Sequence, residues 1–185
     1  GRTARVETLG GELVSYRDER GLEYIWGGDP AYWPGRNPLL FPIVGMLKEG
    51  KIRFDGREYA MERHGFARRR EFTPAARGED WVRLELRESA ETLALYPYPF
   101  RLAVEQRLTD TGFSTAVTVA NPGEGPLPFC LGAHTGFRCP LEAGERFEDY
   151  ELVFPERESC PTLLLRDGLL DRPAALPCLE DTDTL

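Results

Sequence analysis

The chain contains only two histidines, and each stands in a short phrase of glycine and aromatic residues that is suited to acid–base chemistry. His64 lies in the phrase Arg-His-Gly-Phe-Ala-Arg at 63–68, and His134 lies in Gly-Ala-His-Thr-Gly-Phe at 132–137. Imidazole is the side chain that changes its charge most readily near neutral pH. Together the two phrases predict a pocket that transfers protons and stacks against a sugar. A lone histidine is as often an ordinary polar residue, so the rest of the chain has to support this interpretation.

The composition of the chain limits what such a pocket could serve. With 185 residues, of which 41% are hydrophobic and 11% aromatic, the sequence predicts one folded domain with a substantial core. The formal net charge of −8 argues against nucleic acids and anionic membranes as partners, since both require a cationic face. No apolar run is long enough to span a bilayer and no charged-then-apolar leader opens the chain, so we expect a cytoplasmic protein.

The four cysteines offer little support for a metal or redox centre. No two of them have the two-residue spacing of a zinc knuckle or a redox motif. Reduced thiols in a cytosolic protein are the favoured interpretation, so a metal centre built from Cys and His is not expected. The cysteines are Cys130, Cys139, Cys160 and Cys178.

Alternating hydrophobicity indicates that antiparallel strands position the two histidine phrases. The stretches 82–86, 100–108 and 113–119 have the period of half-buried strands. Asp55 and Gly56 lie between two further strand-like runs and suit the positive φ angles of a tight hairpin turn. Shorter strands are expected at 12–16, 23–26, 51–54, 57–61 and 150–154.

Helical structure is predicted at one place only. Residues 89–95 begin with Ser89 as a cap and end before Tyr96 and Pro97, because proline forbids continuation. The loop at 27–38 is long and rich in glycine, proline and aromatic residues, which is typical of functional loops. Strands joined by short turns predict an all-β, mainly antiparallel sandwich or barrel, forming a single domain over residues 1–185.

Four sequence motifs in a fixed order carry a resemblance to a known family. They are Asp-Pro-Ala-Tyr-Trp at 29–33, Leu-Phe-Pro-Ile-Val-Gly at 40–45, His-Gly-Phe-Ala-Arg at 64–68, and Gly-Ala-His at 132–134 followed by Phe137 and Cys-Pro-Leu at 139–141. From about residue 9 to residue 154 the chain resembles the aldose 1-epimerase (galactose mutarotase-like) superfamily, in its bacterial branch of LacX-like proteins. The resemblance implies a β-supersandwich that binds sugars in an open cleft.

The resemblance also implies a reaction and assigns residues to it. Mutarotation opens a cyclic hemiacetal and recloses it on the other face of C1, while a base takes the C1 hydroxyl proton and an acid protonates the ring oxygen. This reaction requires neither a cofactor nor a metal, so we expect none. By similarity His134 is the acid, and His64 is a second donor to the ring oxygen or a nearby hydroxyl. Arg68 would hold a hydroxyl or an anionic substituent, because its guanidinium forks onto such groups. Phe137 and Trp33 would cover the apolar face of the sugar.

Some of these assignments have structural alternatives. Phe137 and Trp33 could equally be ordinary core residues. Arg68, Arg69 and Arg70 form a basic cluster that would favour a phosphorylated or acidic sugar, although a solvated face is the more common origin of such a run.

Two departures from the family's pattern bear on catalysis. An arginine that contacts the substrate usually follows the glycine of the Phe-Pro-Ile-Val-Gly phrase, whereas this chain has Met46, which leaves Lys48 as the candidate substitute. The family's general base is a glutamate on a late strand, and no glutamate of this chain matches that motif. Glu142, Glu145 and Glu148 follow His134, but their setting predicts a solvated turn.

The domain is therefore expected to lack the family's C-terminal strands. Uncovered strand edges and core surface would then pair with another chain, so we expect a homo-oligomer. Three functions stay open: an aldose 1-epimerase acting on a small-molecule sugar, a carbohydrate-binding β-sandwich without turnover, and a purely structural β-sandwich.

Overall fold

The computed structural model describes residues 1–156 and 162–176, and the chain forms two compact units, Gly1–Arg138 and Cys139–Leu185. Within the described residues every pair of strands is antiparallel, beside one isolated parallel bridge between Phe41 and Gly65, and there is a single α-helix, of six residues. The predicted all-β, mainly antiparallel class is therefore confirmed. None of the helical segments in the described ranges is both long and apolar enough to cross a membrane.

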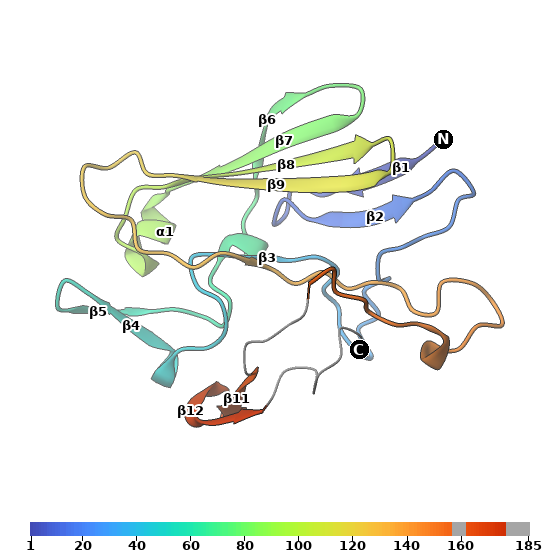
Figure 1. Ribbon diagram of the computed structural model, residues 1–185. Coiled ribbons are helices and arrows are strands. Elements are labelled where there is room, and N and C mark those ends of the chain that lie inside the picture. The colour runs from blue at the N-terminus through green and yellow to red at the C-terminus, as the bar shows by residue number, and fades with distance from the viewer. Residues whose placement is uncertain (157–161, 177–185) are drawn as a thin grey trace. The chain divides into compact units, whose positions relative to one another are not determined.

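A four-stranded sheet dominates the first unit (Figure 1). Its strands follow one another in space in their sequence order. Short turns join the first two strands and the last two, whereas the connection between the second and third strands contains the helix. The three strands expected from alternation are present, and a fourth precedes them. The strands are β6 (Thr73–Arg77), β7 (Trp81–Arg87), β8 (Arg101–Thr109) and β9 (Gly112–Ala120).

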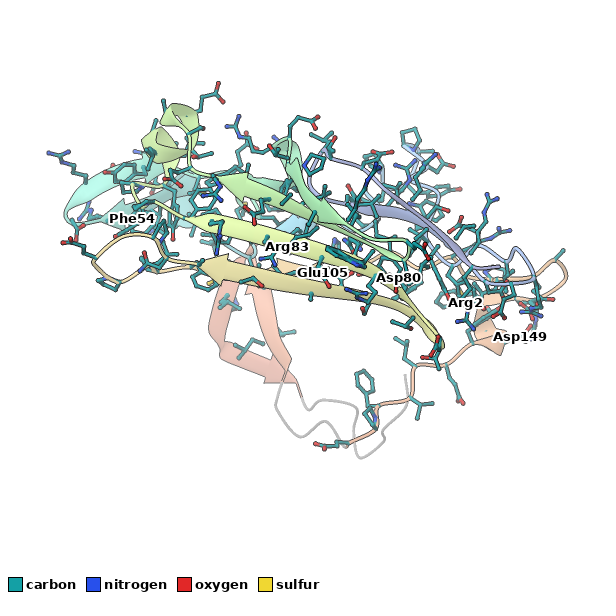
Figure 2. All side chains as sticks on the ribbon, turned by 90° about the horizontal axis from the view of Figure 1, so that it is seen from above. Arg2, Phe54, Asp80, Arg83, Glu105 and Asp149 are labelled. Carbon is teal, nitrogen blue, oxygen red and sulfur yellow. The ribbon has the colours of Figure 1, made fainter. Side chains whose placement is uncertain are left out.

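The alternation in these strands separates a buried face of the sheet from a charged one. Leu102 and Val104 of β8 are almost wholly buried, and Gln106 is buried with both ends of its amide satisfied. Figure 2 views the sheet from above and shows Arg83 and Glu105, which are paired across β7 and β8. The period of two in the sequence thus corresponds to the two faces of the sheet.

Aromatic side chains form the centre of the core. The centroid of the Phe41 ring lies 5.2 Å from that of Phe100 and 6.0 Å from that of Tyr96. The ring centroids of Phe66 and Phe100 are 5.8 Å apart. All four side chains are at most 5% exposed. Because Phe41 and Phe66 belong to two of the motifs noted above, core packing anchors the segments that carry the motifs.

The remaining elements confirm two local predictions. Helix α1 (Ala90–Leu95) begins after Ser89, whose hydroxyl accepts a hydrogen bond from the Thr92 amide. Asp55 and Gly56 have φ angles of 47° and 79° in the predicted hairpin. The other strands are β1 (Thr3–Val6), β2 (Leu13–Arg17), β4 (Lys51–Phe54), β5 (Arg57–Ala60) and, in the second unit, β11 (Thr162–Arg166) and β12 (Leu169–Leu176).

The strand predicted at 23–26 is wrong, since only isolated bridges form there. The carboxylate of Glu23 accepts hydrogen bonds from the amides of Tyr16 and Ile25 and from the Ser15 hydroxyl. A side chain thus takes backbone donors that a continuous ladder would use.

The strand predicted at 150–154 is also wrong. Val153 forms an isolated β-bridge and no continuous strand, and the side chains of Leu152 and Val153 are both more than 60% exposed. The apolar alternation there does not correspond to a buried face.

Candidate functional site

The two imidazoles face each other in the first unit. Their ring centroids lie 6.3 Å apart with an angle of 29° between the planes. His64 is half-buried, whereas His134 is exposed. We refer to His64 and His134 as the imidazole pair. At this separation both rings are within reach of one small molecule.

One stretch of backbone, residues 38–45, holds both histidine phrases, and we call it the central segment. Strand β3 (Leu39–Leu40) within it pairs with β10 (Gly132–Ala133), which directly precedes His134. The His134 amide then donates to the carbonyl of Pro38 at 3.1 Å. The short ladder therefore fixes the backbone from which this imidazole extends.

The other end of the central segment holds the His64 phrase. The carbonyl of Phe41 accepts hydrogen bonds from the amides of Phe66 and Ala67 at 3.0 and 3.2 Å. The His64 amide donates to the Gly45 carbonyl at 2.8 Å. Backbone bonds at both ends of one segment thus set the distance between the imidazoles.

The backbone of the His64 phrase is unusual. His64 and Gly65 have consecutive left-handed φ angles of 67° and 70°, which is uncommon for a residue other than glycine. A Cβ at Gly65 would lie 2.2 Å from the Phe41 carbonyl oxygen, so only glycine fits. Such a conformation persists only where the surroundings enforce it, and it is frequent at functional sites.

A hydrogen bond fixes the tautomer of His64. The Gly45 amide donates to Nδ1 of His64 at 3.0 Å, so Nδ1 is an acceptor and the proton of the neutral ring lies on Nε2. Burial lowers the pKa of His64 from its usual value, and the charges of Arg68, His134 and Arg63 lower it further. The neutral form of His64 is therefore favoured, with its donor N–H at Nε2.

Trp33, in the long 27–38 loop, contacts His134. The two rings lie edge to face with centroids 4.9 Å apart. A Cβ at Gly35 or Gly136 would come within 2.6 or 2.7 Å of the indole, so both glycines leave room for it. Trp26 donates from Nε1 to the Trp33 carbonyl at 2.8 Å. The indole is thus held in a fixed slot beside His134.

The predicted substrate-binding arginine, Arg68, is the last residue of the His64 phrase. Arg68 lies in the 3₁₀ turn η2 (Ala67–Arg69), and its Nη2 donates to the Arg63 carbonyl at 2.9 Å. Arg63 in turn places its Nη2 3.7 Å from Sδ of Met46. Sequence reasoning gave Arg63 no role, although it directly precedes His64 in the quoted phrase.

The other candidate residues are on the surface. Phe137 is 68% exposed, which excludes the alternative of core packing for it. Lys48 is an exposed residue that begins the 3₁₀ turn η1 (Lys48–Gly50). Asn37, which the sequence did not single out, accepts a hydrogen bond from Thr135 at 2.6 Å and so ties the residue after His134 to the loop.

The acidic residues that follow His134 in the sequence belong to the second unit. Glu142, Glu145 and Glu148 are exposed, and Glu145 accepts a hydrogen bond from the Tyr150 hydroxyl, as expected of a solvated turn. Among the residues that the structure describes, no group of three or more His, Cys, Asp and Glu side chains is arranged to hold a metal ion. Cys130 and Cys139 are free thiols, whereas Cys160 and Cys178 lie outside the described residues.

Comparison with known proteins gives a family for this geometry. Residues 1–168 match the sequence profile of the family described as Aldose 1-epimerase. The plasmid-encoded protein LacX of Lactococcus lactis subsp. lactis is 40% identical over 191 residues, which cover 99% of this chain. The chain spans 64% of the length of that relative.

Two solved structures share the fold. A galactose mutarotase related enzyme from Lactobacillus acidophilus is 28% identical with a TM-score of 0.89, over 95% of this chain and 60% of its own. A galactose mutarotase-like protein from Lactobacillus casei is 30% identical with a TM-score of 0.86, over 100% of this chain and 64% of its own. The predicted galactose mutarotase-like sandwich is therefore confirmed.

Proposed function

The chain belongs to the aldose 1-epimerase family, and from this premise we propose that its imidazole pair opens and recloses the ring of an aldose, interconverting the α and β anomers. The observation that carries the proposal is the approach of His64 and His134 to within 6.3 Å. Ring opening requires an acid that protonates the ring oxygen and a base that takes the C1 hydroxyl proton. We assign the acid to this chain, and the C1 hydroxyl proton passes to solvent water. Two imidazoles at this separation can contact neighbouring oxygens of one pyranose.

His134 is the proposed acid for the ring oxygen. It is the exposed member of the pair, so a ligand can reach it, and Trp33 restrains its ring from one side. A well-placed acid of this kind contributes a rate factor of roughly 10² to 10⁴. When the ring recloses after rotation about the C1–C2 bond, the same group takes the proton back.

His64 is the proposed second donor. Since Gly45 donates to Nδ1 and the ring is neutral, Nε2–H is available for the ring oxygen or an adjacent hydroxyl. A neutral donor stabilises developing charge without exchanging its own proton. The two imidazoles therefore have different roles, with His134 transferring the proton and His64 binding the oxygen that receives it.

Arg68 and Phe137 complete the proposed sugar site. Arg68 ends the His64 phrase and offers guanidinium N–H groups to a substituent of the sugar. The exposed Phe137 ring is suited to the apolar face of a pyranose. The contact between Trp33 and His134 favours a positioning role for the indole rather than direct stacking on the sugar.

A second candidate function is sugar binding without turnover. The observation that favours it is the thioether of Met46, which lies at a position where the family resemblance implies a substrate-binding arginine. Methionine offers only a weak acceptor and no charged donor. A site with this substitution would retain the imidazoles as binding groups.

Polarimetry and calorimetry on the 185-residue chain distinguish these functions. Freshly dissolved α-galactose and α-glucose are followed with the wild type, with H134A and with R53A, an exposed β4 variant that controls for handling. We expect accelerated mutarotation in the wild type and R53A, and a loss of about 100-fold or more in H134A. Calorimetric binding without acceleration would establish the binding-only function. If the chain neither binds a sugar nor accelerates mutarotation, both functions are overturned.

A further inference from the structure

Two guanidinium groups beside the imidazole pair differ from their neighbours in having no carboxylate partner. In the same stretch of chain, Arg69 pairs with Glu62 and Arg70 pairs with Glu91. Neither Arg63 nor Arg68 forms an ion pair with any carboxylate in the part of the chain that the structure describes. Two of the four arginines between residues 63 and 70 are therefore in ion pairs with carboxylates, and the other two are not.

The Arg63 guanidinium has most of its hydrogen-bonding capacity free. Its side chain is exposed, and its hydrogen-bond contact within the described residues is the one from Nη2 to Met46 Sδ at 3.7 Å. A thioether is a weak acceptor, so it orients the guanidinium without neutralising its charge. The planar fork of N–H groups remains available for an anion.

The Arg68 guanidinium is held more firmly. Its Nη2 donates to the Arg63 carbonyl at 2.9 Å, and its Nε is buried with no partner among the described residues. A buried donor without an acceptor is costly unless a ligand or water satisfies it. Arg68 is thus a restrained positive charge with a donor to spare, next to the backbone of Arg63.

Both charges act on the site rather than on remote parts of the surface. Arg68 and Arg63 are each close enough to His64 to lower the pKa of its ring. His64 is neutral, so the two guanidiniums give this side of the site a positive charge in a chain whose net charge is −8. Glu62, the partner of Arg69, offsets part of the Arg68 charge. Neither guanidinium has a carboxylate at ion-pair distance among the described residues, so an anionic substituent of the sugar would pair with them, whereas a neutral hexose would not.

We propose that the site selects an anionic aldose, one that carries a phosphate or a carboxylate, and that Arg63 and Arg68 bind this group. The inference rests on the proposed function, because it names the substrate class of the same site. Phosphate and carboxylate share the oxygen geometry that a guanidinium fork matches. Arg63 is the exposed, specificity-determining member, and Arg68 is the restrained one.

Calorimetry with matched sugars on the 185-residue chain tests the proposal. Glucose, glucose 6-phosphate and glucuronate are titrated, as are galactose, galactose 6-phosphate and galacturonate, at low and at high salt. We expect at least one anionic class to bind about tenfold or more tightly than the neutral sugar, with the advantage reduced at high salt. Comparison of the 6-phosphates with the uronates shows whether the site prefers a phosphate or a carboxylate.

Charge-matched variants identify the residues that are responsible. R63Q is expected to weaken binding of the preferred anionic sugar about tenfold and to leave the neutral sugar unchanged. R70Q removes the same charge close by, from a residue already paired with Glu91, and should leave both unchanged. R68K keeps the charge but loses the fork, and should weaken the anionic sugar less than R63Q does.

A double variant tests whether the loss in R63Q comes from the missing guanidinium or from a disturbance of the local fold. Because Met46 Sδ lies next to Arg63, the double variant M46R/R63Q returns a guanidinium to the same place. We expect it to recover most of the anionic binding that R63Q loses.

Three results separate failure of the inference from failure of the function. Equal binding of neutral and anionic sugars with mutarotation intact would overturn the inference alone. An anionic preference that R63Q and R68K leave unchanged would overturn the assignment of the two arginines. Absence of binding for every sugar would overturn the proposed function, and the inference with it.

Discussion

In the four-stranded sheet neighbouring strands follow one another along the chain, whereas the imidazole site joins segments that are far apart in sequence. Strands β7, β8 and β9 pair in continuous register along their length. In the site, residues from the 27–38 loop, the central segment, the His64 phrase and the His134 phrase meet through short ladders and single hydrogen bonds. Local pairing builds the sheet, and long-range backbone bonds build the site.

The two regions also depend on different interactions. The sheet buries Leu102 and Val104, so its contribution to stability comes mainly from apolar area removed from water. The site relies on close backbone approach at Gly65 and on hydrogen bonds to the carbonyls of Phe41 and Gly45. We therefore expect variants in the sheet to lower stability and leave sugar binding intact, whereas variants in the site should disturb sugar binding whether or not they also lower stability.

The largest effect is expected at Gly65. In G65A the added Cβ would collide with the Phe41 carbonyl, which lies 2.2 Å from its position, so the backbone bonds of the His64 phrase must break. We expect a loss of unfolding free energy on the order of 4 kcal/mol in urea denaturation, together with loss of sugar binding.

A second glycine provides the control for G65A. Gly56 has a similar positive φ of 79°, but a Cβ there would meet no atom within 4 Å. G56A should therefore cost only about 1–2 kcal/mol, the usual penalty of a left-handed residue, with binding intact. Equal losses in the two variants would contradict the importance of the close approach.

A core truncation in the sheet should lower stability without lowering sugar affinity. L102A removes a fully buried side chain of β8, so we expect an unfolding free energy lower by about 3 kcal/mol. The sugar affinity of the folded fraction should stay close to that of the wild type, because the central segment, although it shares the hydrophobic core with Leu102, is held by its own backbone hydrogen bonds. A changed affinity at temperatures where the variant is folded would show that the two regions are coupled.

These two regions were unequally predictable from the sequence. Strands β7, β8 and β9 and the hairpin at Asp55 and Gly56 could be predicted because period and turn chemistry are local signals. Strand β6 was missed, since all its residues are exposed and Pro74 interrupts any alternation. Strands β3 and β10, with two residues each, are too short to carry a period.

The site was predicted only in part for a related reason. The motifs and the resemblance predicted His64, His134, Arg68 and Trp33 as site residues. The contacts of these residues could not be predicted, because they join segments that are far apart in the sequence. No sequence pattern shows that Gly45 fixes the tautomer of His64, or that Arg63 contacts Met46. These facts depend on how the central segment meets the His64 phrase in three dimensions.

A smaller effect is expected when the indole beside His134 is removed. W33L should lower kcat about tenfold with little change in KM, because His134 would lose the ring that restrains it. W33F retains an aromatic edge and should recover much of the rate. If W33L instead raises KM with kcat unchanged, Trp33 binds the sugar directly.

The smallest effect concerns pH. Burial and nearby positive charge lower the pKa of His64 in the folded chain below its usual 6.5, so the unfolded chain binds more protons as the pH falls past that value. The stability that His64 contributes is therefore fully present above pH 6.5 and is lost as the pH falls toward the folded pKa. Urea denaturation at several pH values should show the H64Q variant losing less stability on acidification than the wild type. Parallel pH profiles would contradict the lowered pKa.

The most direct test of the account is an NMR titration of the two imidazoles with the sugar that calorimetry identifies as the tightest ligand. The chain has only two histidines, so two-bond ¹H–¹⁵N spectra resolve both rings, and H134A assigns them. We predict a neutral His64 with its proton on Nε2, and shifts at both rings that follow one dissociation constant. Shifts confined to one ring, or a His64 protonated on Nδ1, would contradict a shared site built around the central segment.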